Sequence, residues 1–564
     1  MPVLGAHCPD LGCRQIKLHD VLLCYNALRA MMDLDDLLTE IGQFGKYQKS
    51  VLWLVLLPCV FPCGFHAYNQ LFMAAKPDHW CRVPELEDLS YEVAKNLSIP
   101  MEERDGEMRF SQCTMFNKSS TGEFNSSNRV TCQHGWIYDK TVYKNSVTTE
   151  WNLVCEDNIL STLALVAFGT GGLIGNYIFG YIQDRHGRKS AFFIYLFIQT
   201  VFGIATALAS SFGIWVLFRF GVGFTIPSIL STPSILAIEL VGPKYRSTVT
   251  VLINIAYSID LIVLSIIVWA VRDWRQLALF TTVPFIALFA LYWAMPESPR
   301  WLMARGDFVR AEKILNKMAR VNKRTAFVSE IRHLNTGDLS IKSNDKADYG
   351  MVDLFKLPKL RLKTLIITFI WFTNTSVYVG LSYYAPALGG DEFFNFFLAG
   401  VAELPTYIFL WPAMERIGRR WILFSTMVVG GIACTSTLVI NDATIRLGLY
   451  CVGKMGISAS FVVLPLMASE TYPTVVRGIG MSLSSVAGML GPVFIPLINY
   501  LGARTLTLPL IIMGALLIAG GLSSLLLPET LRRNLPQTLE DAEKDGLVDF
   551  RWWRKYEKRE LQED

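Results

Sequence analysis

Charged residues are scarce in this chain. Of its 564 residues only 18% are Asp, Glu, Lys or Arg, whereas 52% are hydrophobic, and the mean hydropathy is +0.35. This composition excludes an ordinary soluble protein of the same size. The formal net charge of +4 does not by itself indicate a partner, and we expect no nucleic acid to be one. The positions of the charges are more informative than their sum.

Several chemical motifs are missing as well. The sequence contains no Walker loop, no zinc-binding pattern and no nucleophile elbow, which mark ATP hydrolysis, zinc sites and one class of hydrolases. We therefore predict that the chain is not an enzyme and has no catalytic residue, no metal and no cofactor. Residues 1–31 hold no apolar run long enough for a secretory signal or a spanning helix.

Long apolar stretches, by contrast, recur along the chain. A helix that crosses a bilayer needs about 20 mainly apolar residues, and twelve stretches approach or exceed that length. We therefore predict an all-α membrane protein with twelve transmembrane helices, at residues 51–74, 159–182, 190–210, 213–238, 248–270, 277–295, 363–387, 393–413, 421–440, 445–468, 479–500 and 507–527.

Three charged motifs occur twice, at a nearly constant distance. The spacing is 231 residues for two motifs and 232 for the third. A distance kept over half of the chain predicts two equivalent halves of six helices, the plan of many secondary transporters. The repeat joins Asp184 and Arg188 to Glu415 and Arg419, Glu239 and Arg246 to Glu470 and Arg477, and Pro296 to Pro528.

Lysine and arginine collect after predicted helices 2, 4, 6, 8 and 10, and short loops rich in these residues face the cytoplasm. We therefore predict a multi-pass protein of the plasma membrane with both termini in the cytoplasm. The expected divisions are a cytoplasmic segment 1–50, a six-helix half 51–296 that includes an extracellular loop 75–158, a cytoplasmic linker 297–361, a second half 362–530 and a cytoplasmic tail 531–564.

The long loop after the first helix has the content of an extracellular segment. An even number of cysteines in an oxidising compartment favours disulfides, and four cysteines allow three pairings, all of which remain open. Three glycosylation sequons within about thirty residues predict that at least one is used. The cysteines are Cys81, Cys113, Cys132 and Cys155, and the acceptor asparagines are Asn96, Asn117 and Asn125.

Four charged residues fall well inside predicted spans, namely Arg219, Asp260, Glu403 and Lys454. Each costs about 2.5–3.5 kcal/mol on insertion scales, so such residues usually face a cavity or a partner. One alternative is that Arg219 pairs with Asp260 and Glu403 with Lys454. The other is that an unpaired carboxylate binds an amine substrate.

Further segments resemble one family. Residues 42–48, 149–155, 273–275, 296–302, 403–405 and 472–477 are similar to motifs of the organic cation/carnitine/organic anion transporter family of the major facilitator superfamily. The overall pattern resembles insect members of that family, including those proposed for carcinine or β-alanine. The resemblance covers nearly all of residues 32–529 and implies the major facilitator fold. It makes residues 1–31 an alternative or mispredicted leader.

The charged and aromatic residues have expected roles in such a fold. Ion pairs of the repeated motifs are expected to form an inner gate that holds the outward-facing state and breaks when the carrier opens inward. The gate residues are Asp184, Arg188, Glu239, Arg246, Glu415, Arg419, Glu470 and Arg477. The expected substrate-binding residues are Asp260, Tyr257, Tyr378, Trp371, Glu403, Lys454 and Arg219.

Three positions depart from the family pattern. Asp260 stands where the family usually has a small uncharged residue, and Tyr257, one turn earlier, adds an aromatic face that suits an amine. Twelve residues after Arg477, where the family places an aspartate or an arginine, the chain has Met489. Eight residues after Arg219, where cation carriers have a lysine, it has Pro227.

These observations predict a secondary transporter, either a uniporter or a facilitative carrier, that works by alternating access in the lipid bilayer. Its expected substrate is a small organic cation or a zwitterionic amine similar to carnitine, carcinine or β-alanine. One alternative is a cell-surface receptor or scaffold with the same fold that has lost transport. A sugar or polyol carrier is the other alternative. No feature of the sequence indicates an oligomeric state.

Overall fold

The computed structural model describes most of the chain between its termini. The described residues are 34–86, 88–104, 107–118, 124–324, 350–440, 442–502, 508–531, 536 and 538–544. The predicted leader lies outside them, as do the centre of the predicted linker and most of the predicted tail.

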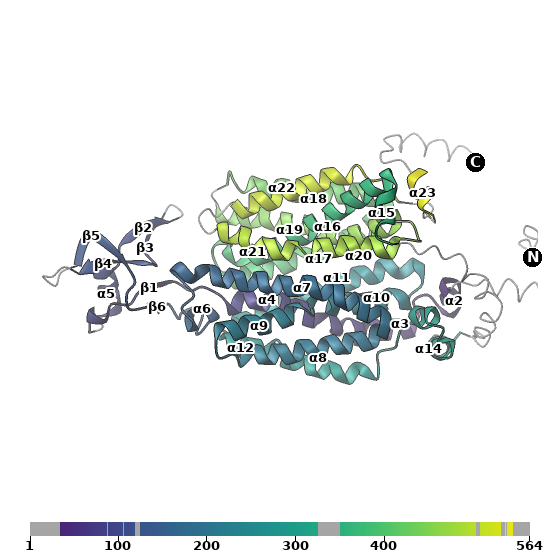
Figure 1. Cartoon of the computed structure of the whole chain (residues 1–564), viewed down its shortest axis with the longest axis horizontal. Helices are drawn as coiled ribbons and strands as arrows, with labels where there is room; N and C mark the ends of the chain where they lie inside the picture. Colours follow the sequence, from purple (N-terminus) through teal and green to yellow (C-terminus); the bar gives the residue numbers. More distant parts are fainter. Residues whose placement is uncertain are drawn as a thin grey trace, which may run out of the picture.

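Two helical halves lie side by side along the long axis of the molecule (Figure 1). The first half contains α3 (Lys46–Val51), α4 (Phe61–Met73), α7 (Asn158–His186), α8 (Arg188–Ala207), α9 (Phe212–Gly223), α10 (Ile226–Leu240), α11 (Arg246–Ala270) and α12 (Trp274–Phe280), with a π-helical turn at Leu52–Leu56 and 3-10 segments at Pro58–Val60, Pro243–Tyr245 and Val283–Tyr292. The second half contains α16 (Pro358–Tyr384), a 3-10 segment at Ala385–Leu388, α17 (Glu392–Arg416), α18 (Arg419–Ser436), α19 (Ala443–Thr471), α20 (Arg477–Gly488), α21 (Gly491–Leu501) and α22 (Leu508–Ser524).

Ten helical segments of the described residues are long and apolar enough to cross a membrane, and each coincides with a predicted span. The other two predictions, 421–440 and 507–527, coincide with α18 and α22. Two arginines begin α18, and α22 has only 17 residues, so both segments are less apolar or shorter than the rest. Each half therefore supplies six helices, as the sequence predicts.

Several spans that are continuous in the sequence are interrupted in the structure, among them the fourth and the eleventh. The fourth is divided into α9 and α10 by a break that Pro227 follows, and the eleventh into α20 and α21 by a break that Pro492 follows. Proline is tolerated in the first turn of a helix, where its missing N–H is not needed. Irregular backbone at membrane depth is tolerated where it is buried in protein or lines a cavity.

A small separate domain projects from one end of the helical body (Figure 1). We call this end the outer end and the opposite one the inner end. The domain corresponds to the predicted loop 75–158. It contains β1 (His79–Cys81), β2 (Met101–Arg104), β3 (Glu107–Phe110), β4 (Thr114–Lys118), β5 (Phe124–Thr131), β6 (Trp136–Tyr138), α5 (Tyr91–Ser98), α6 (Val147–Glu150) and 3-10 turns at Pro84–Leu86 and Cys155–Asp157, with antiparallel pairs β1–β6, β2–β3 and β4–β5.

Both predicted disulfides are present, and the structure decides their pairing. Cys81 bonds to Cys132, and Cys113 bonds to Cys155. The first joins β1 to the end of β5 and closes the domain on itself. The second ties the start of β4 to the segment that leads into α7, so the domain is also fastened to the helical body.

The predicted glycosylation sites lie in the same domain. Asn96 is exposed on α5, and Asn117 is half-buried on β4. The side chain of Asn125 lies outside the described part of the chain. Glycosylation itself stays a prediction.

Short helices gather at the inner end. They are α2 (Leu34–Ile41), α13 (Pro299–Ala304), α14 (Phe308–Val321), α15 (Asp353–Lys356) and α23 (Leu539–Lys544). The first residues of α14 and α23 are 231 positions apart, and so are Ala311 and Ala542, both of which are fully buried. The repeat therefore continues beyond the spans into these helices.

Side chains from the inner-end segments hold the first helix of each half. Asn322, just after α14, accepts the backbone N–H of Tyr47 at 3.0 Å. Glu543 of α23 accepts the backbone N–H of Lys359, at the start of α16, at 3.0 Å. Each contact satisfies a donor that the first turn of a helix leaves unpaired.

Candidate functional site

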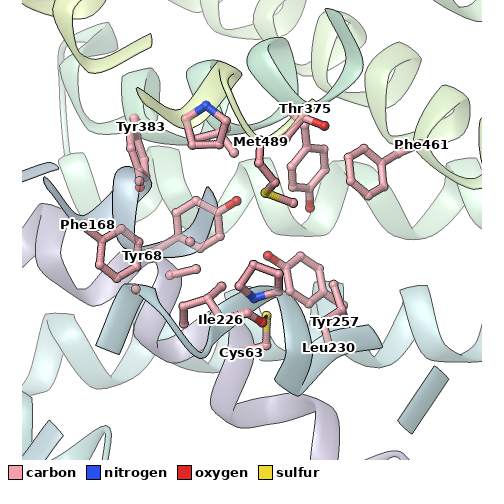
Figure 2. A pocket seen from close by; sticks show the side chains of 18 of the residues that line it. Cys63, Tyr68, Phe168, Ile226, Leu230, Tyr257, Thr375, Tyr383, Phe461 and Met489 are labelled. Atoms are coloured by element: carbon pink, nitrogen blue, oxygen red, sulfur yellow. Dashed lines mark hydrogen bonds between the residues drawn. The ribbon is translucent and has the colours of Figure 1, made fainter. Parts of the chain in front are cut away.

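A cavity of about 140 Å³ lies between the two halves. Figure 2 shows Cys63, Ile226 and Tyr257 of the first half opposite Met489 and Phe461 of the second. The full lining consists of Cys63, Ala67, Tyr68, Phe168, Gly169, Gly172, Gly223, Ile226, Pro227, Leu230, Asn254 and Tyr257 from the first half, and Thr375, Tyr378, Val379, Tyr383, Tyr407, Phe461, Met489 and Pro492 from the second.

The lining is aromatic and carries no formal charge. Five of the lining residues are tyrosines and two are phenylalanines, whereas none of those described is Asp, Glu, Lys, Arg or His. Asn254 and Thr375 add amide and hydroxyl groups. Such walls suit an amine through the negative face of an aromatic ring and through hydrogen bonds.

The broken helices contribute to this cavity. Pro227 and Ile226 begin α10, while Met489 lies in the break between α20 and α21 and Pro492 just after it. The two halves also approach closely here, because a side chain added at Gly169 of α7 would come within 2.7 Å of the Pro492 carbonyl oxygen. The sequence therefore places its helix breaks beside the cavity.

Glu403 and Lys454 form an ion pair directly behind the cavity wall. Lys454 Nζ lies 3.0 Å from Glu403 Oε1, and both side chains are fully buried. The same ammonium group lies 3.6 Å from the centroid of the Tyr378 ring, and Tyr407 donates a 3.2 Å hydrogen bond to Glu403 Oε2. Since both tyrosines line the cavity, they separate it from the two charges.

Two serines complete the surroundings of the pair. Ser258 of α11 donates a hydrogen bond to Glu403 Oε2, and Lys454 donates a 2.6 Å hydrogen bond to Ser382 of α16. Because Ser258 belongs to the first half, the pair also contributes a contact between the halves. Of the two alternatives for Glu403 and Lys454, the structure shows the ion pair.

Arg219 is also fully buried, but its neighbours are neutral. Its Nε donates to Gln70 Oε1 at 2.8 Å, and its Nη2 donates to the His66 carbonyl oxygen at 3.0 Å. Its guanidinium carbon lies 4.9 Å from the centroid of the Phe168 ring, which lines the cavity. The predicted pair of Arg219 with Asp260 is wrong, because polar groups of helix α4 bind the guanidinium instead.

Asp260, an expected substrate-binding residue, lies outside the cavity lining. Its side chain is fully buried and does not line the cavity. The carboxylate lies against the backbone of Gly64, and a side chain at that glycine would overlap Oδ2. Its neighbour Tyr257, by contrast, lines the cavity as predicted. Direct contact of Asp260 with a substrate is therefore not available in this conformation.

Trp371 does not line the cavity either. Thr375 and Tyr378, one and two turns further along α16, do so instead. Tyr407 was missed by sequence reasoning, although it stands four residues after Glu403 and so lies on the same face of α17. This helical spacing from a buried charge was the signal that could have identified it.

The repeated charged motif builds the same contact at the inner end of each half. In the first half, Glu297 accepts the backbone N–H of Arg188 at 2.9 Å and that of Lys189 at 3.2 Å, at the start of α8. Arg188 pairs with Glu239 at 3.2 Å and with Asp184 at 3.4 Å. Burial raises the pKa of Glu297 above its usual value, although the bonds from the backbone act in the opposite sense.

The second half repeats this arrangement. Glu529 accepts the backbone N–H of Arg419 at 3.0 Å and that of Arg420 at 3.2 Å, and Arg419 pairs with Glu470 at 3.4 Å. The side chain of Glu415 lies outside the described part of the chain. These ion pairs each join helices of one half, and their role in gating stays a prediction.

The remaining two gate residues have different partners. Arg246 pairs at 2.6 Å with Asp35 of α2, which also binds Arg300 at 2.5 Å. Arg477 donates a 3.2 Å hydrogen bond to Thr474. The repeat is unequal here because Arg246 pairs with a carboxylate of α2, a helix that precedes the first half.

Aromatic rings close the space between the halves toward the outer end. The ring of Phe72, near the end of α4, lies 6.2 Å from that of Phe393 and 5.2 Å from that of Phe396 on α17. The ring of Tyr68 lies 5.7 Å from that of Phe396 and 5.8 Å from that of Tyr383. We call these five residues the outer seal. Two of them, Tyr68 and Tyr383, also line the cavity.

Known proteins share this sequence over most of its length. Residues 113–541 match the model of a family described as "Sugar (and other) transporter". The β-alanine transporter of Drosophila melanogaster is 53% identical over 544 residues, which cover 91% of this chain and 89% of that protein. The carcinine transporter of Drosophila melanogaster is 43% identical over 537 residues, 91% of this chain and 79% of that protein. The organic cation/carnitine transporter 2 of Homo sapiens is 33% identical over 529 residues, which cover 90% of this chain and 94% of that protein.

The chain belongs to the organic cation/carnitine/organic anion transporter family. Its fold is that of the major facilitator superfamily. The xylose transporter XylE from E. coli, in a partially occluded inward open conformation, superimposes with a TM-score of 0.56 and 16% identity over 86% of this chain and 100% of that one. An inward open structure of XylE superimposes with a TM-score of 0.54 and 18% identity, and the match covers 70% of this chain and 91% of that one.

This member of the organic cation/carnitine/organic anion transporter family has neutral residues at two marker positions. Met489 and Pro227, which replace the expected charged residues, both line the cavity. In this family member, Lys454 and Arg219 each lie behind an aromatic ring that lines the cavity, Tyr378 and Phe168.

Proposed function

We propose that this chain is a facilitative carrier that moves small zwitterionic amines or weakly charged organic cations across the plasma membrane by alternating access. The main observation that supports this proposal is the cavity between the halves, whose described lining is rich in tyrosine and has no charged side chain. The relatives named for β-alanine and carcinine support this class of substrate.

The electrostatics of the cavity are the reason that we propose zwitterionic or weakly charged amines as substrates. A carboxylate in the wall would favour a cation, and a lysine or arginine would favour an anion, whereas a neutral wall favours neither. The Glu403–Lys454 pair behind the wall has no net charge but is a strong dipole. A molecule that carries both an ammonium and a carboxylate group complements such a dipole, while tyrosine faces accept the ammonium group.

The outer end is assigned to the extracellular side. The disulfides and sequons of the strand domain support this assignment, because disulfides persist in oxidising compartments. The arginine-rich motifs and the helices α2 and α23 lie at the other end (Figure 1). Both ends of the chain are accordingly proposed to lie in the cytoplasm.

Uptake of labelled compounds by cells that express the full chain tests the proposal. The panel contains β-alanine, carcinine, carnitine, a permanently charged organic cation, an organic anion and glucose. We expect saturable uptake of β-alanine or carcinine. Surface-expressed protein that takes up none of the compounds would favour the receptor or scaffold, and uptake of glucose alone would favour a sugar carrier.

A substitution in the cavity wall tests the electrostatic argument. Met489→Asp places a carboxylate in the lining, and we expect the ratio of cation uptake to β-alanine uptake to rise by about tenfold, the effect of an interaction worth ~1.4 kcal/mol. Met489→Leu is the matched control because it keeps the volume and adds no charge. An unchanged ratio in the aspartate variant, at normal surface expression, would contradict the assignment of the cavity.

A further inference from the structure

Asp260 is a buried carboxyl group for which the proposed transport mechanism has no use. It lies in the middle of α11, its side chain is fully buried, and no side chain of the described residues binds Oδ1 or Oδ2, so that the carboxyl group faces only the backbone N–H of Gly64. The other buried carboxyl group within a span, that of Glu403, is bound by Lys454, Ser258 and Tyr407. Asp260 therefore differs from Glu403, because no side chain compensates for its burial.

An ionised carboxylate is not stable in such surroundings. Burial in a medium of low polarity disfavours the charged form, and only a cation or several hydrogen-bond donors would compensate for the lost hydration. The two buried cations of the neighbouring spans are already bound, Arg219 by α4 and Lys454 by Glu403. Asp260 therefore carries a proton in this conformation.

The group lies one layer behind the cavity. Cys63 of α4 and Tyr257 of α11 both line the cavity (Figure 2), and Tyr257 stands three residues before Asp260 on the same face of α11. Gly64 follows Cys63 directly and lies against the carboxylate. A small displacement of this segment of α4 would open a path between the carboxylate and the cavity.

The helix in front of Asp260 is built irregularly. The chain forms a π-helical turn at Leu52–Leu56 and a 3-10 turn at Pro58–Val60 before α4 begins, and a second proline, Pro62, stands in the first turn of α4. Such interruptions weaken the backbone ladder and are frequent at functional hinges. The segment that covers Asp260 is therefore suited to move between transport states.

The other groups around Asp260 do not offer a competing partner. The thiol of Cys63 and the phenol of Tyr257 are neutral at physiological pH. Helix α10, which packs between α4 and α11, has no ionisable side chain before Glu239 at its inner end. On α17 and α19 the ionisable groups at this depth, Glu403 and Lys454, pair with each other.

We propose that Asp260 binds and releases one proton in each transport cycle, so that substrate movement is coupled to proton movement. This inference rests on the proposed substrate and cavity, but it replaces facilitative movement of the substrate with movement that is coupled to a proton. The carboxyl group is protonated while the segment around Gly64 covers it. When that segment moves, the O–H bond breaks and the proton passes to water in the cavity, leaving the carboxylate exposed to the cavity.

The experiment uses the purified full chain in proteoliposomes, with potassium and valinomycin to hold the membrane potential at zero. Exchange of labelled for unlabelled β-alanine at equal pH reports transport alone. A pH difference of about one unit is then imposed in either direction, with and without a protonophore. We expect the pH difference to change β-alanine accumulation by up to about tenfold, because one unit is tenfold in proton activity.

Asp260→Asn imitates the protonated group and cannot release a proton. We expect this variant to retain exchange at equal pH and to lose the response to the pH gradient. Asp139→Asn is the matched control, because Asp139 only accepts the backbone N–H of Thr141 in the strand domain, at 2.9 Å, and it should respond as the wild type does. A gradient that accelerates uptake from the acidic side identifies symport, and one that slows it identifies exchange; both support the inference.

Measurements on the wild-type protein alone can contradict the proposed proton coupling. Exchange of β-alanine without any response to the pH gradient, and without substrate-induced acidification or alkalinisation recorded by an internal pH dye, would contradict proton coupling and leave the proposed function intact. A gradient response that persists in an active Asp260→Asn variant would assign the proton to another group. Absence of exchange for β-alanine and carcinine would contradict both proposals.

Discussion

At the scale of single residues, Gly187 allows the tight turn between α7 and α8 because it has no side chain. Gly187 has φ +91°, which side chains disfavour, and a side chain there would overlap Glu297 Oε2. Gly418, with φ +98°, has the same role beside Glu529 in the second half. The glycines of the two motifs are thus required by the carboxylate that binds the next helix.

Substitution of this glycine has an expected result. Gly187→Ala should lower the thermal unfolding temperature of the detergent-purified protein, because a positive φ combined with ψ 162° costs a residue with a side chain about 1–3 kcal/mol and the Glu297 contact must also shift. Gly180→Ala, seven residues earlier in α7, is the control, since no atom lies near a side chain added there. Equal unfolding temperatures for both variants would contradict the role of Gly187.

The Glu403–Lys454 pair provides a second test at this scale. Removal of one partner leaves a buried charge without compensation, which costs about 3–5 kcal/mol, whereas replacement of both is often neutral. We expect Glu403→Gln and Lys454→Met each to destabilise the protein strongly and the double variant to recover most of the loss. Thermal unfolding of the purified variants measures this.

An additive double-variant cycle would contradict the importance of the pair for stability. Uptake should behave differently from unfolding. Because the charges lie behind Tyr378 and Tyr407 and form the dipole of the cavity wall, the double variant should remain folded and still lose selectivity for a zwitterion over a permanent cation.

At the scale of elements, α6 fastens the strand domain to the first half. Glu150 accepts hydrogen bonds from Arg275 at 2.5 Å, Trp274 at 2.8 Å and Asn145 at 3.1 Å. Asp273 caps α12 beside them by accepting backbone N–H groups. This cluster joins the last part of the predicted loop 75–158 to the short segment between the fifth and sixth predicted spans.

The cluster predicts a pH dependence. Burial alone would raise the pKa of Glu150, but the hydrogen bonds from Arg275, Trp274 and Asn145 outweigh it and hold the pKa below its usual value. The resulting stability is present above the pKa of an unfolded glutamate, about 4.3, and is lost as the pH falls through the lower pKa of the folded state. Because the pair is partly solvated, we expect on the order of 1 kcal/mol or less.

Thermal unfolding from neutral to acidic pH, with Glu150→Gln as the comparison, measures this contribution. The wild type should be the more stable protein near neutral pH, and the difference should vanish in acid. A difference that stays constant at every pH would show that the charge of Glu150 is not responsible.

At the scale of the whole molecule, the outer seal and the cavity describe one state of the transport cycle. The rings that close the outer end belong to both halves, so movement of one half relative to the other must separate them. The charged motifs at the inner end, in contrast, hold helices within each half. These contacts stabilise each half internally.

A native thiol reports this movement. Cys63 lines the cavity, and the outer seal separates it from the outer end. A membrane-impermeant thiol reagent added outside intact cells should modify Cys63 slowly in the wild type and several times faster after Phe396→Ala, because loss of a ring in the seal favours the outward-open state. Cys63→Ser in both backgrounds identifies the signal from this residue. Equal rates in the two backgrounds would contradict the seal.

Much of this architecture follows from the sequence alone. Apolar length predicted the spans, because a bilayer imposes a minimum helix length on any chain that crosses it. The 231-residue spacing predicted two halves and matches the equivalent contacts of Arg188 with Glu239 and of Arg419 with Glu470. Pairing of Glu403 with Lys454 was one of two alternatives that the sequence left open, because unpaired charges are unfavourable inside a membrane, and the structure shows the pair.

Only the tertiary structure decided which buried groups meet. Four cysteines allow three pairings, and the packing of the strands selects one of them. Arg219 binds polar groups of α4 instead of Asp260, and Tyr407 enters the cavity wall, because helix rotation and the approach of segments distant in the sequence depend on packing across the whole bundle. The charge and period of a residue are local properties of the sequence, whereas its neighbours are a property of the folded chain.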